Sequence, residues 1–155
     1  MQTLNKIMVA VDFSDYSLPA VRYAARLAED VGAELLLVNV INQRDLDMMK
    51  KVADQAPAFS FDTYLEQMQA DREEGFQQLI KAAGFDRTAV KTIIRLGVPY
   101  QELLNVIEAK KPDILVMATK GRSNLMDTIL GSCAQKMFRR SPIPVLSLRG
   151  EGHVD

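Results

Sequence analysis

Two glycines bound a short polar stretch, KGRSNLMDTILGS, that directly follows an apolar run of the chain. Gly121 lies between Lys120 and Arg122, and Gly131 precedes Ser132 after nine intervening residues. Glycine lets a ligand approach the main chain closely because it has no Cβ. Free N–H groups at a helix N-terminus favour anions, above all phosphate, and the helix dipole adds to this preference. The spacing therefore indicates a main-chain site for phosphate, with the positively charged side chains of Lys120 and Arg122 beside it.

A second group of polar residues follows the first apolar run of the chain. The sequence VDFSDYS places Asp12 and Ser14 directly after that run. A carboxylate at Asp12 would repel phosphate, so it suits a sugar hydroxyl, a base amino group or a metal ion better. Taken alone, Asp12 also suits a helix cap, and short glycine motifs often occur in ordinary turns. The functional interpretation therefore depends on whether the fold brings the two groups together.

The elements that must position these residues alternate between apolar runs and helical patterns. Apolar runs predict strands at 6–12, 33–41, 89–97, 113–119 and 143–148. Helical spacing predicts helices at 17–31, 61–83, 99–109 and 132–140. Between the second strand and the 61–83 helix, RDLDMMKKVADQ indicates only a helical turn or two.

Glycine, proline and serine mark several of the expected helix ends. Gly32 is expected to end the 17–31 helix, whose buried face should extend from Ala20 to Val31. Pro99 suits the first turn of its helix. Ser132 is expected at an N-cap, where a glutamine three residues later completes a capping-box pattern.

This order of elements predicts an α/β fold with a doubly wound, five-stranded parallel sheet and helices on both faces. The expected strand order is 3-2-1-4-5, which reverses between the first and fourth strands. Ligands of open α/β sheets bind beyond the carboxyl ends of the strands at such a reversal. Asp12 follows the first strand and Gly121 follows the fourth, so both groups should meet there. Their convergence favours a binding site over two unrelated turns.

Composition limits the classes of protein that fit. The 155 residues suit one domain, expected to span 1–155, and the net charge of −1 provides no overall attraction to nucleic acid or anionic membranes. The single cysteine, Cys133, excludes an internal disulfide and suits a reducing compartment. No apolar run approaches the roughly 20 residues of a membrane span. We therefore expect a cytoplasmic protein with no nucleic-acid or membrane partner.

Several catalytic motifs are missing from the sequence. No G-x-x-x-x-G-K-[ST] follows a strand, and no G-x-G-x-x-G follows the first one, which disfavours a P-loop hydrolase and dinucleotide redox chemistry. With one histidine and one cysteine, a catalytic Cys–His pair or a zinc site built from them is also disfavoured. We predict no catalytic and no metal-ligating residue.

Together these segments resemble the universal stress protein family. VDFSDYS, LLLVNVI, LGVPYQELL and the stretch from ATKGRSN to IPVLSL carry the similarity, which is weakest across 42–88. The nucleotide-binding branch of that family has a Gly, two residues, a second Gly, nine residues, a third Gly, then Ser or Thr. Here the pattern reads Ala118, two residues, Gly121, nine residues, Gly131 and Ser132. Because Ala118 adds one methyl group, we expect a modest loss of space near a ribose rather than loss of the site.

The resemblance implies a site for an adenine nucleotide, ATP, with Mg²⁺ or Mn²⁺, if present, on the phosphates. The adenine would contact the main chain of Val40, and Asp12 would lie nearest the ribose and base. The phosphates would lie on main-chain N–H groups around Gly131, beside Lys120 and Arg122. The complete predicted set of nucleotide-binding residues is Ala10, Val11, Asp12, Ser14, Val40, Met117, Ala118, Lys120, Gly121, Arg122, Gly131, Ser132 and Cys133.

The function that the resemblance implies is an ATP-binding regulatory or stress-response module whose conformation or partner affinity depends on nucleotide occupancy. One alternative is a slow ATP hydrolase, against which stands the lack of an obvious general base near the predicted phosphates. Another is a nucleotide-free dimerisation module of the same fold. Similar proteins commonly dimerise through the last strand, so a homodimer through 143–148 is expected.

Overall fold

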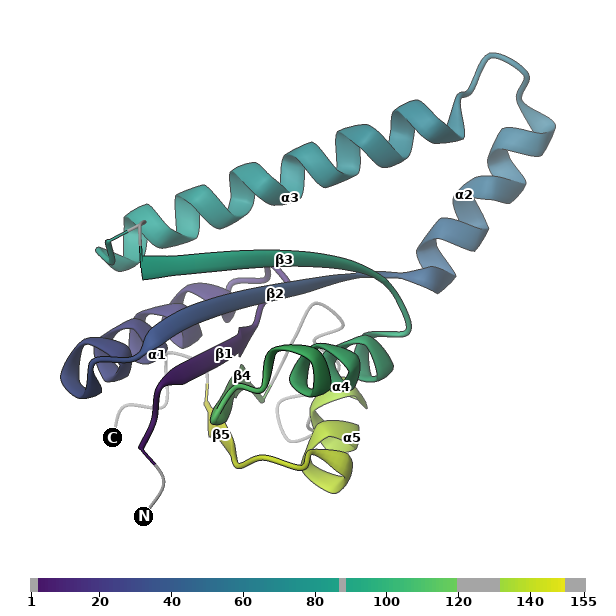
Figure 1. Cartoon of the computed structure of the whole chain (residues 1–155). Helices are drawn as coiled ribbons and strands as arrows, with labels where there is room; N and C mark the ends of the chain where they lie inside the picture. The colour runs from purple at the N-terminus through teal and green to yellow at the C-terminus, as the bar shows by residue number, and fades with distance from the viewer. Residues whose placement is uncertain (1–2, 87–88, 120–131, 150–155) are drawn as a thin grey trace.

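The computed structural model describes residues 3–86, 89–119 and 132–149. A five-stranded parallel sheet with strand order β3-β2-β1-β4-β5 lies at its centre (Figure 1). The strands are β1 (Lys6–Ala10), β2 (Glu34–Asn42), β3 (Val90–Gly97), β4 (Ile114–Ala118) and β5 (Val145–Leu148). This topology confirms the predicted fold, including the reversal of strand order between β1 and β4.

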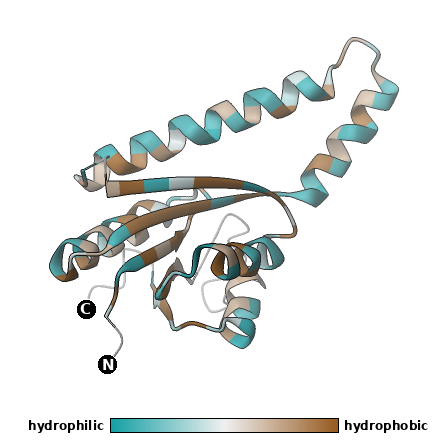
Figure 2. Cartoon of the chain, viewed as in Figure 1, coloured by the Kyte–Doolittle hydropathy of each residue, from teal (hydrophilic) through white to brown (hydrophobic). Residues whose placement is uncertain are grey.

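Helices cover both faces of the sheet, and each face has its own apolar core. The helices are α1 (Ser17–Val31), α2 (Gln43–Gln55), α3 (Phe61–Ala83), α4 (Pro99–Lys110) and α5 (Ser132–Arg140). Successive residues of a strand point to opposite faces. Leu35 and Leu37 of β2 therefore pack with α1 and α3, while Leu36 and Val38 pack with α4 and α5. Figure 2 shows the resulting run of hydrophobic residues along β2.

Helix ends follow the predicted signals in most places. Gly32 ends α1 with a left-handed backbone (φ 71°) and donates its N–H to the Ala28 carbonyl. Pro99 is in the first turn of α4. By contrast, Ser132 is the first helical residue of α5 rather than the predicted N-cap residue before the helix. Val31, predicted on the buried face, is 43% exposed because it lies in the last turn of α1.

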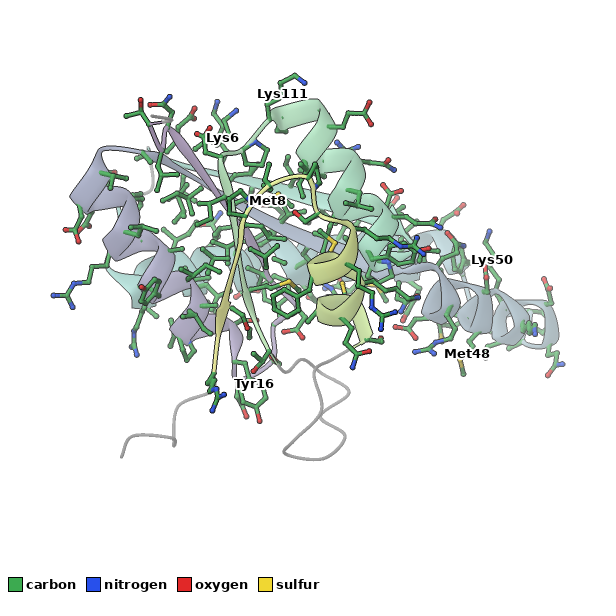
Figure 3. All side chains as sticks on the ribbon, turned by 90° about the horizontal axis from the view of Figure 1, so that it is seen from below. Lys6, Met8, Tyr16, Met48, Lys50 and Lys111 are labelled. Atoms are coloured by element: carbon green, nitrogen blue, oxygen red, sulfur yellow. The ribbon has the colours of Figure 1, made fainter. Side chains whose placement is uncertain are left out.

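Helix α2 is the main correction to the predicted elements. It is a helix of 13 residues rather than a turn or two, and Leu46 is the one buried residue assigned to it. Its start is stabilised by Asn42, whose side chain accepts a hydrogen bond from the Arg44 N–H at 3.0 Å. In Figure 3, Met8 lies within the sheet, whereas Met48 and Lys50 lie on α2 far to one side.

None of the helices in the described ranges is both long enough and apolar enough to cross a membrane.

Candidate functional site

A cleft of about 520 Å³ opens where β1 and β4 end, at the reversal of the sheet. The end of β2 and the starts of α2, α4 and α5 form most of the remaining wall, to which Ser17 of α1 and Arg72 of α3 also contribute. This volume lies within the range of roughly 300–1,000 Å³ that is typical of small-molecule sites. We refer to this space as the cleft.

Most of the predicted nucleotide-binding residues line the cleft. Those that do are Ala10, Val11, Asp12, Val40, Met117, Ala118, Ser132 and Cys133. Lys120, Gly121, Arg122 and Gly131 lie outside the described residues. The structure therefore brings together the ends of three strands and the start of α5, as the topology predicts.

Ser14 is not among the residues that line the cleft, although it is bonded to Asp12. Its N–H donates to Asp12 Oδ1 at 3.0 Å, and its hydroxyl accepts a hydrogen bond from the Tyr16 N–H at 3.3 Å. It lines a second hollow, formed by Phe13, Ser14 and one side of α3. Any contact between Ser14 and a ligand in the cleft stays a prediction.

Asp12 has a structural role as well as a place on the cleft wall. Its Oδ1 accepts hydrogen bonds from the Ser14 N–H and from the hydroxyl of Ser17, the buried first residue of α1, each at 3.0 Å. The carboxylate therefore holds the turn between β1 and α1. Asp12 is not the N-cap of α1, which is Tyr16, so the helix-cap alternative is wrong in that form, although the carboxylate does bond the first residue of the helix.

The sequence did not predict the role of Asn39. This side chain is 2% exposed, and its Nδ2 donates to the Val11 carbonyl at 2.7 Å. The Val11 N–H donates to the Val38 carbonyl at 2.8 Å, so both main-chain groups of Val11 are bonded within the protein. Arg72 of α3 donates from Nη1 to Asn39 Oδ1 at 3.2 Å. A polar residue inside the apolar run LLLVNVI was a signal for Asn39, whereas nothing distinguished Arg72 from other charges on its helix.

The main chain at the end of β4 is partly occupied by the sheet. The Thr119 N–H donates to the Leu148 carbonyl at 2.9 Å, which extends the β4–β5 pairing by one residue. This amide is therefore not available to an anion. The predicted phosphate-binding amides after Thr119 lie outside the described residues.

Cys133 and Asp12 both line the cleft. Burial and, to a smaller extent, the negative charge of Asp12 raise the pKa of the Cys133 thiol to about 11, against the opposing effect of the Lys136 ammonium. The thiol is therefore protonated at neutral pH.

Cys133 should react slowly with alkylating reagents. Between an ordinary pKa of 9.0 and a pKa of about 11, the thiolate fraction at pH 8 falls roughly 100-fold. We expect iodoacetamide to modify the folded protein about 100 times more slowly than the urea-unfolded chain, and the rate to rise with pH towards 11. Asp12→Asn should speed the reaction. Equal rates for folded and unfolded protein would contradict this assignment.

Comparison with known proteins adds to this geometry. Residues 3–149 match the family model described as the universal stress protein family. The chain belongs to the universal stress protein family. A universal stress protein of Methanocaldococcus jannaschii is 29% identical over 145 residues, which cover 94% of this chain and 82% of that protein.

Two solved structures resemble this universal stress protein over nearly its whole length. One is a second protein of Methanocaldococcus jannaschii, at 25% identity and a TM-score of 0.73, with 97% of this chain and 99% of that one covered. The other is a universal stress protein solved in complex with cAMP, at 25% identity and a TM-score of 0.64, with 95% and 98% covered.

Proposed function

We propose that this universal stress protein binds an adenine nucleotide, ATP, in the cleft and acts as a nucleotide-dependent regulatory module. The observation that carries the proposal is the cleft itself, which combines the ends of β1, β2 and β4 with the start of α5 at the sheet reversal. The cAMP complex of a relative supports an adenine nucleotide as the class of ligand.

The chemistry of the walls suits the two halves of such a ligand. Val38, Val40 and Leu103 offer an apolar surface for the base, and Asp12 offers an acceptor for a ribose hydroxyl. At the other end, the Ser132 hydroxyl and the positive end of the α5 dipole favour phosphate. We assign Gly121 and Gly131 to the same phosphate contacts on the basis of their spacing.

The charge of Asp12 predicts a role for a divalent cation. Because this carboxylate acts on Cys133 at the start of α5, phosphates bound there experience repulsion from it. Mg²⁺ or Mn²⁺ held by the phosphates and water would offset that repulsion. Affinity for ATP should therefore fall when the divalent cation is chelated.

Calorimetry with ATP and magnesium tests the proposal. We expect saturable binding that weakens with EDTA, and titrations with AMP and cAMP rank the adenine nucleotides. A phosphate-release assay on the same samples separates binding from turnover. No binding of any of these nucleotides up to millimolar concentration would refute the proposed function.

We also propose a cytoplasmic homodimer that pairs through β5. Cys133 is a free thiol, which suits a reducing compartment. β5 is an edge strand of the sheet, and exposed edges readily pair with a second chain. Light scattering should give twice the chain mass of 17.3 kDa. A monomer at micromolar concentration would contradict the dimer.

A further inference from the structure

Phe13, the residue after Asp12, has an unusual backbone. Its φ is 62°, in the left-handed region that bulky residues rarely adopt. Such a conformation persists only where the surrounding structure holds it, and it often occurs beside functional sites. The contacts of Phe13 therefore show what fixes the segment from Val11 to Phe13, which includes the acid of the cleft.

Helix α3 supplies these contacts from one face. The rings of Phe13 and Phe76 pack edge to face, with centroids 5.1 Å apart. Gly75 lies directly against the Phe13 ring, because a Cβ there would be only 2.7 Å from Phe13 Cε1. The guanidinium carbon of Arg72 lies 5.7 Å from the centroid of the same ring. Arg72, Gly75 and Phe76 are spaced so that they share a helix face.

Arg72 also acts on the other end of the segment. Its bond to Asn39 at 3.2 Å continues through Asn39 Nδ2 to the Val11 carbonyl at 2.7 Å. Arg72 thus lies over the ring of Phe13, and it is linked to the Val11 carbonyl through the buried side-chain amide of Asn39. Asp12 lies between these two points, with its carboxylate held by Ser14 and Ser17.

We propose that α3 sets the nucleotide affinity of the cleft by positioning the Val11–Phe13 segment, with Arg72 and Gly75 as its positioning residues. The proposal rests on the proposed function, since it names a control on the same site. Because coupling is reciprocal, a nucleotide that shifts Asp12 also acts on α3. Helix α3 continues past the sheet towards α2 (Figure 1). A shift of α3 on nucleotide binding would therefore be transmitted to α2.

Two substitutions separate positioning from direct contact. Arg72 itself lines the cleft, so Arg72→Gln alone is ambiguous. Gly75 and Phe13 are not among the described residues that line it. Gly75→Ala introduces the methyl group that Phe13 must avoid, whereas alanine favours the helix more than glycine does. If Gly75→Ala loses affinity without a lower melting temperature, the loss must therefore come from displacement of Phe13.

The experiment measures ATP affinity with magnesium for the wild-type protein, Arg72→Gln and Gly75→Ala. Glu74→Ala and Lys81→Gln are controls on exposed positions of α3, and the second removes the same charge as Arg72→Gln. We expect about tenfold weaker binding in both test variants and changes below about twofold in both controls, tenfold being ~1.4 kcal/mol. Wild-type affinity in Gly75→Ala would overturn the proposal, whether or not Arg72→Gln loses affinity.

Amide hydrogen exchange, followed by NMR in the free protein, provides a readout that needs no ligand. The Val11 N–H bonds to Val38 and the Ser14 N–H bonds to Asp12, so both report on the segment. We expect about tenfold faster exchange of these two amides in both test variants and wild-type rates in the controls. If the wild-type protein binds no nucleotide, the proposed function fails, and unchanged exchange would separately overturn the positioning role of α3.

Discussion

Ala118→Leu should weaken ATP binding about a hundredfold, or by ~2.8 kcal/mol. Ala118 is the last residue of β4, it is half-buried, and it lines the cleft. From its place in the glycine pattern, we propose that it lies beside the ribose. A leucine side chain there would fill space that the sugar needs, because the close-packed backbone of β4 cannot move away to make room for it. Calorimetry with ATP and magnesium measures the loss.

The matched control is Ala118→Gly, which restores the glycine of the family pattern at this position. It leaves the cleft open, so we expect affinity within about threefold of wild type. Circular dichroism should show that both variants keep the fold, because Ala118 pairs with Leu148 at the carboxyl ends of β4 and β5 rather than in the middle of these strands. A folded Ala118→Leu protein with wild-type affinity would mean that the nucleotide lies elsewhere.

Phe76→Ala should have the largest effect on stability, a loss of ~3–5 kcal/mol. Phe76 is 1% exposed, and it is the largest of the fully buried side chains among the described residues. From α3 it packs against α1 and the sheet, and its ring meets the ring of Phe13 edge to face. Removing it leaves a cavity that the neighbouring helices can only partly close. At ~2–4 °C per kcal/mol for a chain of this size, the melting temperature should fall by about 10 °C.

Phe138→Ala is the control for that substitution, since it deletes the same ring from a position that is 40% exposed. A loss below about 1 kcal/mol is expected there. Urea unfolding of the two variants and the wild type gives the free energies. Equal losses at both positions would show that α3 is not packed on the sheet as described.

Local sequence signals predicted most of the fold because they coincide with burial. The 61–83 helix matches α3 from end to end, since its apolar residues recur at helical spacing and Gly84 ends it with a left-handed backbone (φ 72°). Helix α2 was predicted too short; it has a cap at Asn42 and one buried residue, Leu46. The helical spacing of Leu46, Met49 and Ala53 was a signal for the full helix that the prediction did not use.

The candidate site was predictable as far as topology determines it. Strand order decides which strand ends meet, and this placed Asp12 and the end of β4 at one cleft, whereas Val40 was expected from the family resemblance. The path from Arg72 through Asn39 to Val11 was not predictable. It joins residues 33 and 28 positions apart, and it depends on how α3 packs against the sheet, which no local pattern encodes.

A crystal structure of the protein grown with saturating ATP and magnesium tests the central claim most directly. The account predicts the base beside Val40, the ribose between Asp12 and Ala118, and the phosphates at the start of α5. Nucleotide bound in the second hollow beside Phe13, or a cleft that holds no nucleotide under those conditions, would contradict it.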